Sequence, residues 1–149
     1  MSTRAIINVT DGRRTLRLRK HCDGYPSDTL DVIKDGLATK PADAQTCADT
    51  LLEQSPRHEG RFGGLCLEQI TYGDFTPDTL GCQFDLEWIY VVDLDAKVIR
   101  IYGGRYADCS PQEHYERGMV DYDDDDDVSD DVLAGLTRLG YTINSSERD

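Results

Sequence analysis

The amino-acid sequence predicts one α+β domain spanning residues 1–149, with an antiparallel sheet of four to five strands and helices mainly on one face. Two segments of alternating apolar residues, each interrupted by a turn signal, predict two β-hairpins. Around them, apolar residues recur at helical spacing behind residues that cap helices. Hairpins with helices between them indicate an antiparallel sheet covered by helices.

The first hairpin is predicted at the start of the chain. Arg4–Thr10 is rich in β-branched residues, and Thr15–His21 alternates apolar and basic residues. Asp11-Gly12 between them is typical of a tight turn, because glycine tolerates positive φ. One face is expected to carry Ala5, Ile7, Val9, Leu16 and Leu18, and the other Arg17 and Arg19.

The middle of the chain predicts two helices and a second hairpin. Ser27 is a suitable N-cap for a helix with its apolar stripe at Leu30, Ile33 and Leu37. The other expected elements are a helix at Ala42–Gln54, a strand at Leu65–Tyr72 and hairpin strands at Asp85–Asp93 and Val98–Tyr102, with Trp88 and Tyr90 in the core.

The last part predicts two helices and an edge strand. Pro111–Arg117 begins behind Ser110 as a short helix, and Ser129 caps Asp130–Leu139, which ends at Gly140. Tyr141–Ile143 is expected to form an edge strand before a frayed tail. The buried stripe of the last helix is predicted to be Val132, Leu133, Leu136 and Leu139.

Negative charge is concentrated near the end of the chain. Residues 108–131 hold eleven carboxylates and one arginine, and so ten of the thirteen net negative charges of the protein. Like charges at this density cannot be buried, so the segment must face water or a cationic partner. The expected partner-binding residues are Asp121, Asp123, Asp124, Asp125, Asp126, Asp127, Asp130, Asp131, Glu113 and Glu116, with 121–131 as an acidic loop.

The amino-acid composition disfavours several classes of function, above all direct binding to nucleic acid or to membranes. A net charge of −13 disfavours direct binding to nucleic acid or to an anionic membrane, although residues 1–20 alone carry a net charge of +5. No apolar run approaches the length of a membrane span or a signal peptide, so a cytoplasmic location is expected. Five cysteines without a CxxC pair indicate reduced thiols, mostly buried.

The candidate catalytic and metal-binding motifs are weak, so no enzyme activity, cofactor or metal is expected. His21 and Cys22 are adjacent on a predicted strand, where their side chains point to opposite faces, so they do not form a nucleophile–base pair. The turn after them is expected to be structural, with Tyr25 over the core and His21 hydrogen-bonded locally. Asp123–Asp127 lacks the central glycine and terminal glutamate of a calcium-binding EF-hand loop.

The segment His21-Cys22-Asp23-Gly24-Tyr25-Pro26 carries a resemblance. A short hairpin, a His-x-Asp-Gly-Tyr-Pro motif and a helix resemble the N-terminal part of small proteins of bacterial viruses and prophages. Their downstream hairpin is similar to Glu87–Asp93 with Val98–Tyr102, although Cys22 stands where a tryptophan is usual. The family has no general activity, so the resemblance implies a mobile-element origin and no site residues.

Charge and class together suggest a non-enzymatic inhibitor of a host defence complex, similar to anti-CRISPR proteins. Its acidic surface would occupy the basic nucleic-acid-binding groove of a host protein. A solvated loop that only keeps the protein soluble is the simplest alternative. Another is a protein that binds a nucleotide or small molecule through Arg17, Arg19 and Tyr25. The sequence leaves the partner and the oligomeric state open.

Overall fold

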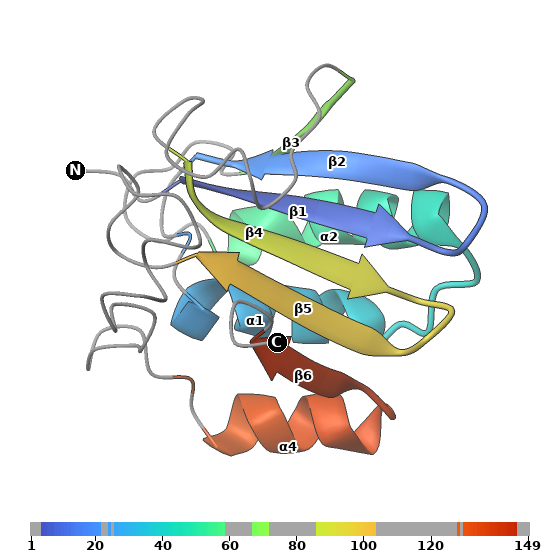
Figure 1. Ribbon diagram of the computed structural model, residues 1–149, viewed down its shortest axis with the longest axis vertical. Helices are drawn as coiled ribbons and strands as arrows, with labels where there is room; N and C mark the ends of the chain where they lie inside the picture. Colours follow the sequence, from blue (N-terminus) through green and yellow to red (C-terminus); the bar gives the residue numbers. More distant parts are fainter. Residues whose placement is uncertain are drawn as a thin grey trace.

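The computed structural model describes residues 4–21, 24, 26–58, 67–71, 86–103, 128 and 130–145, without the side chains of residues 27, 54–58, 86, 87, 103 and 145. A six-stranded sheet of order β3-β2-β1-β4-β5-β6 forms its body. Helices α1 and α2 lie across one face, and α4 lies beside the edge strand β6 (Figure 1). The elements are β1 (Arg4–Thr10), β2 (Thr15–Lys20), α1 (Pro26–Leu37), α2 (Ala44–His58), β3 (Leu67–Ile70), β4 (Leu86–Asp93), β5 (Val98–Gly103), α4 (Asp130–Arg138) and β6 (Thr142–Ser145).

Both predicted hairpins are present. Strand β1 pairs antiparallel with β2, and β4 pairs antiparallel with β5. Gly12 takes a φ of 86° in the first turn, which explains why glycine follows Asp11 there. Leu16 and Leu18 are buried on the helix-covered side, as their alternation with Arg17 and Arg19 predicts.

The sheet is mixed and has six strands, so the prediction of an antiparallel sheet of four to five strands is wrong. Strands β1 and β4 are parallel, as are β5 and β6. The second hairpin reaches its place beside β1 after α1, α2 and β3, and this crossover makes the contact parallel. Trp88, Ile89 and Tyr90 are each at most 1 % exposed, the burial on both faces that is typical of a central parallel strand.

The main core lies between the sheet and helices α1 and α2. Leu30, Ile33 and Leu37 of α1 contribute the predicted stripe, and α2 adds Cys47 and Leu51 among its buried residues. The helices cross closely: a Cβ at Gly36 would lie 2.6 Å from Leu51 Cδ2, so only glycine fits without rearrangement. On the opposite sheet face, a smaller apolar cluster contains Ile6, Ile70 and Ile89.

Two helices differ from their predicted extent or orientation. Helix α2 continues to His58, four residues beyond its predicted end. In α4, Val132 and Leu136 are buried as predicted, whereas Leu133 is 37 % exposed, so its prediction as part of the buried stripe is wrong. Leu133 follows Val132 by one residue, which rotates its side chain about 100° around the helix and away from the body. The predicted helix Pro111–Arg117 lies outside the described residues.

Candidate functional site

The predicted acidic surface is described only at its C-terminal end. Asp130 and Asp131 form the first turn of α4, and both are exposed. Neither forms an ion pair with any residue in the described ranges, and their charge complements the positive end of the helix dipole. The other predicted partner-binding residues lie outside the described part of the chain: Glu113, Glu116, Asp121, Asp123, Asp124, Asp125, Asp126 and Asp127.

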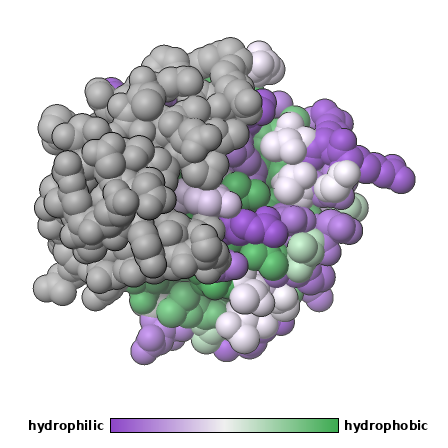
Figure 2. Space-filling model, in the orientation of Figure 1, coloured by the Kyte–Doolittle hydropathy of each residue, from purple (hydrophilic) through white to green (hydrophobic). Residues whose placement is uncertain are grey.

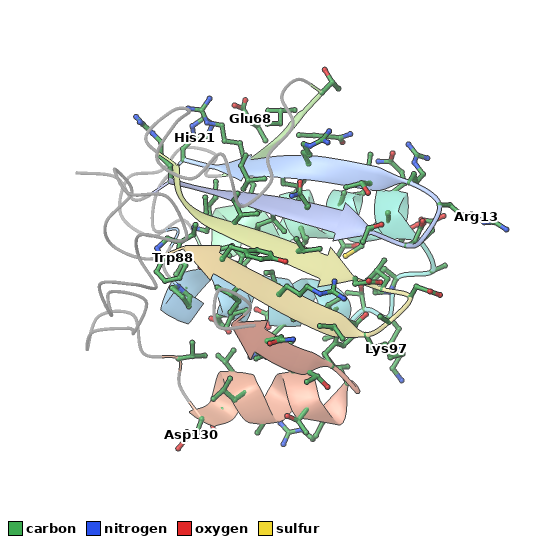
Figure 3. All side chains as sticks on the ribbon, viewed as in Figure 1. Arg13, His21, Glu68, Trp88, Lys97 and Asp130 are labelled. Atoms are coloured by element: carbon green, nitrogen blue, oxygen red, sulfur yellow. The ribbon has the colours of Figure 1, made fainter. Side chains whose placement is uncertain are left out.

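Helix α4 fixes this end of the acidic stretch to the body of the protein. Val132 and Leu136 belong to the main core, and Val128 packs against the same core. Gly135 lies against the stem of Lys34 on α1: a Cβ there would come within 2.7 Å of Lys34 Cδ. Lys34 Nζ lies 3.2 Å from Asp31 and 3.6 Å from Asp35. Asp130 is therefore carried by a docked helix, as its position in Figure 3 also shows.

Lys34 itself is held charged by its surroundings. Partial burial alone would lower the pKa of its ammonium group. The hydrogen bonds and negative charges of Asp31 and Asp35 outweigh that effect and raise the pKa overall. Asp31 and Asp35 therefore pair with Lys34, the residue against which Gly135 of α4 packs.

Several other described carboxylates are likewise engaged within the fold. Asp11 Oδ1 accepts the backbone N–H groups of Arg13 and Arg14 at 2.9 and 3.1 Å. Its Oδ2 accepts the N–H of Ala44 at 2.9 Å, which ties the hairpin turn to the start of α2. Asp43 Oδ1 caps the same helix through the N–H of Thr46 at 2.8 Å. These contacts contrast with the exposed pair at the start of α4.

The Asp11 contacts predict a pH dependence of stability. The N–H groups of Ala44, Arg13 and Arg14 lower the pKa of Asp11 from 3.8 to about 2. A lowered folded-state pKa stabilises the protein above pH 3.8, and this contribution is lost as the pH falls from 3.8 through about 2. We expect Asp11→Asn to be less stable than the wild type near neutral pH, with a difference that shrinks across that acidic range. Urea unfolding at each pH measures it; a difference independent of pH would contradict the prediction.

The hairpin arginines of the alternative ligand site lie on the sheet face opposite α1 and α2. Arg17 is registered with Asn8 and Ile70, and Arg19 with Ile6 and Glu68. Both arginines are half-buried and both interact with other groups of the protein. Hydrophilic and hydrophobic surface alternate over the part of this face that Figure 2 does not draw in grey. Tyr25, the third predicted residue, lies outside the described residues.

The motif between β2 and α1 is tied to the core at its described positions. The Tyr90 hydroxyl donates a hydrogen bond of 2.6 Å to the Gly24 carbonyl. Lys20 Nζ lies 2.8 Å from Asp28 Oδ2, and the Lys20 side chain is only 2 % exposed. His21 Nε2 lies 2.9 Å from Glu68 Oε1 on β3, so its partner comes from a distant strand and not from the motif itself. Cys22 and Asp23 lie outside the described residues.

Metal binding and nucleophilic chemistry place separate requirements on the possible metal ligands and on the described thiol. No group of three or more His, Cys, Asp or Glu side chains within the described ranges is arranged to hold a metal ion. Burial raises the pKa of the Cys47 thiol to about 12, which keeps it protonated and unreactive in the core. Of the helices described, none is long and apolar enough to cross a membrane.

A basic pocket that the sequence did not predict lies at the end of the sheet that carries the hairpin turns. Its volume is about 280 Å³, and its cationic lining residues are Lys40, Lys97 and Arg138. Figure 3 shows Lys97 at the same end of the molecule as Arg13, with His21, Glu68 and Trp88 at the opposite end. The three cations are far apart in sequence, so no local motif reveals the cluster. The available signal was lysine at two turn positions where glycine is usual.

Comparison of the chain with protein-family models, with curated proteins and with solved structures gave no match.

Proposed function

We propose that the protein is a non-enzymatic inhibitor that binds the basic, nucleic-acid-binding groove of a host protein through the acidic stretch 113–131. The observation that carries this proposal is the concentration of ten of thirteen net negative charges in residues 108–131. A charge density of this kind is complementary to the lysine and arginine surfaces that bind nucleic-acid backbones. Electrostatic steering would make association fast at low ionic strength.

The environment of the described carboxylates supports the proposal. Asp28 pairs with a buried lysine, and Asp11 and Asp43 complete a helix start. Asp130 and Asp131 are exposed and form no ion pair within the described ranges, while their helix is docked on the core. A partner's cations would therefore meet carboxylates that have no ion pair with a described residue to give up, which reduces the cost of binding.

The resemblance to small proteins of bacterial viruses suggests which host proteins to consider. A mobile element benefits from blocking the nucleic-acid-binding complexes of host defence, so an anti-CRISPR-like or anti-restriction role in the host cytoplasm is the form of the proposal. The competing assignment to the hairpin arginines has less support, since Arg17 and Arg19 already interact inside the protein. A purely solubilising role for the acidic stretch is the alternative that the experiment must separate.

The test is capture of host proteins from a bacterial lysate on immobilised protein. We expect wild-type protein to retain a nucleic-acid-binding protein that duplex DNA displaces. The triple variant Asp125→Asn, Asp126→Asn, Asp127→Asn should retain it at least about tenfold more weakly, because each lost close charge pair typically costs more than 1 kcal/mol. Retained proteins are identified by mass spectrometry, and the melting temperature of the variant shows whether the fold is intact.

A matched variant removes the same three charges elsewhere. Asp49, Glu53 and Asp95 are exposed on α2 and on the β4–β5 turn, so Asp49→Asn, Glu53→Gln, Asp95→Asn changes the net charge equally. This variant should retain the host protein as the wild type does. Equal loss in both variants would reduce the effect to net charge, and equal retention would leave the acidic stretch with a solubilising role only.

A further inference from the structure

The basic pocket is built from three junctions of the fold. The end of α1 and the residues after it supply Leu37, Lys40 and Pro41, and the β4–β5 turn supplies Lys97. The end of α4 and the residues leading to β6 supply Arg138, Leu139 and Tyr141. The described lining thus combines three cations, an aromatic ring and three apolar side chains, and it includes no carboxylate.

Two of the three cations stand at positions that favour glycine. Lys40 has a φ of 55° and Lys97 a φ of 57°, and they are the only non-glycine residues with positive φ in the described part of the chain. Lys40 follows α1 and donates its N–H to the Leu37 carbonyl at 2.9 Å. Lys97 closes a turn in which Asp93 Oδ1 accepts the N–H groups of the two residues before Lys97, Asp95 and Ala96. Non-glycine residues in this left-handed backbone conformation are strained, and strained backbone positions cluster at functional sites.

The Lys97 side chain is held over the pocket. Its Nζ lies 5.2 Å from the centre of the Tyr141 ring, a cation–π distance. Gly140 takes a φ of 90°, which favours glycine, and a Cβ there would only reach van der Waals contact with Lys97 Cδ, at 3.6 Å. The Lys97 carbonyl accepts the N–H of Thr142 at 3.1 Å, which fixes the turn to β6.

None of the described carboxylates forms an ion pair with the cations of the pocket. Lys20, Lys34 and Arg100 each lie beside an aspartate, whereas the three pocket cations form no ion pair with any described residue. Asp93, on the same turn as Lys97, is engaged by two N–H groups and by Arg100 at 3.5 Å. Lys40 and Arg138 also lie near helix C-termini, which contribute roughly half a negative charge each. The three positive charges outweigh these partial charges, so the described lining of the pocket is net positive.

We infer that this pocket binds a small phosphate monoester. Cations at the rim suit a phosphate dianion, and the ring of Tyr141 with the apolar walls suits a compact organic group. A volume of about 280 Å³ is just below the usual range for ligand pockets, which favours a small occupant. The inference does not depend on the partner of the acidic stretch, because it uses different residues.

The test is isothermal titration of the full chain with phenyl phosphate, with inorganic phosphate and neutral phenol as comparison probes. We expect saturable binding of phenyl phosphate, weaker binding of inorganic phosphate and none of phenol. Arg138→Gln should weaken phenyl phosphate binding at least about tenfold, the loss typical of a charge-assisted hydrogen bond. Arg13→Gln removes the same charge from an exposed turn at the same end of the molecule and should bind as the wild type does.

A second variant separates a binding role from a structural one. Lys40→Gly with Lys97→Gly relieves the backbone strain, so we expect a melting temperature raised by about 2–4 °C together with loss of phenyl phosphate binding. No saturable binding of phenyl phosphate to the wild type would overturn the inference. So would unchanged binding in this variant, equal weakening by Arg13→Gln, or equal affinity for inorganic phosphate. The triple Asp→Asn variant of the acidic stretch should bind phenyl phosphate normally, which keeps the two proposals separable.

Discussion

Asp28→Asn is expected to destabilise the protein by about 3 kcal/mol, because it removes the carboxylate beside an almost fully buried ammonium group. Lys20 Nζ lies 2.8 Å from Asp28 Oδ2, and the lysine side chain is only 2 % exposed. The substitution takes the Asp28 carboxylate, itself 31 % exposed, away from the buried ammonium group, and breaking such a pair from one side costs more than the intact pair contributes. Equilibrium urea unfolding followed by Trp88 fluorescence measures the change.

The matched control for this pair removes both charges. Lys20→Met with Asp28→Asn replaces the ammonium group with an apolar chain of similar length, and we expect it to recover most of the lost stability. If the double variant is as unstable as Asp28→Asn, the Asp28 side chain stabilises the start of α1 by another route and the ion-pair explanation is wrong.

Trp88→Ala is expected to lower the free energy of unfolding by about 3–5 kcal/mol, the usual range for an aromatic side chain removed from a core. Trp88 is 1 % exposed and stacks on Tyr90 with ring centres 6.3 Å apart. Its removal opens a cavity in the main core beside Tyr90. Circular dichroism during thermal unfolding measures the loss.

Tyr90→Phe provides the comparison for Trp88. It keeps the ring and removes only the hydroxyl that donates to the Gly24 carbonyl at 2.6 Å, so we expect a smaller loss of about 1–2 kcal/mol. A Trp88→Ala cost no greater than that of Tyr90→Phe would contradict the central position of Trp88 in the core.

Local sequence signals predicted most of the individual elements. The alternation of Leu16 and Leu18 with arginines, and the Asp11-Gly12 turn, placed the first hairpin correctly. These signals depend only on residues that are close in sequence, so they can be recognised without knowledge of the fold. Strand order depends on contacts between distant segments, and the parallel pairing of β1 with β4 was missed. The near-continuous apolar runs of both strands were the available sign that they are central.

The two candidate sites also differ in whether their residues are close together or far apart in the sequence. The acidic stretch is evident from composition alone, since its charge is local in sequence. The basic pocket is formed by residues up to about a hundred positions apart, from Lys40 to Tyr141, and only the folded arrangement brings them together. Leu133 illustrates a further limit of prediction from sequence. An apolar residue next to a helical stripe is predicted to be buried, and only the way the helix packs shows that it is exposed.

The most direct test of the central claim is the salt dependence of binding between the protein and the captured host protein, for the wild type and for Asp125→Asn, Asp126→Asn, Asp127→Asn. We predict that the wild-type association constant falls steeply as salt concentration rises, and that the triple variant shows weaker binding with a shallower dependence. An association constant insensitive to salt, and the same in both proteins, would contradict the claim that the acidic stretch recognises a cationic partner.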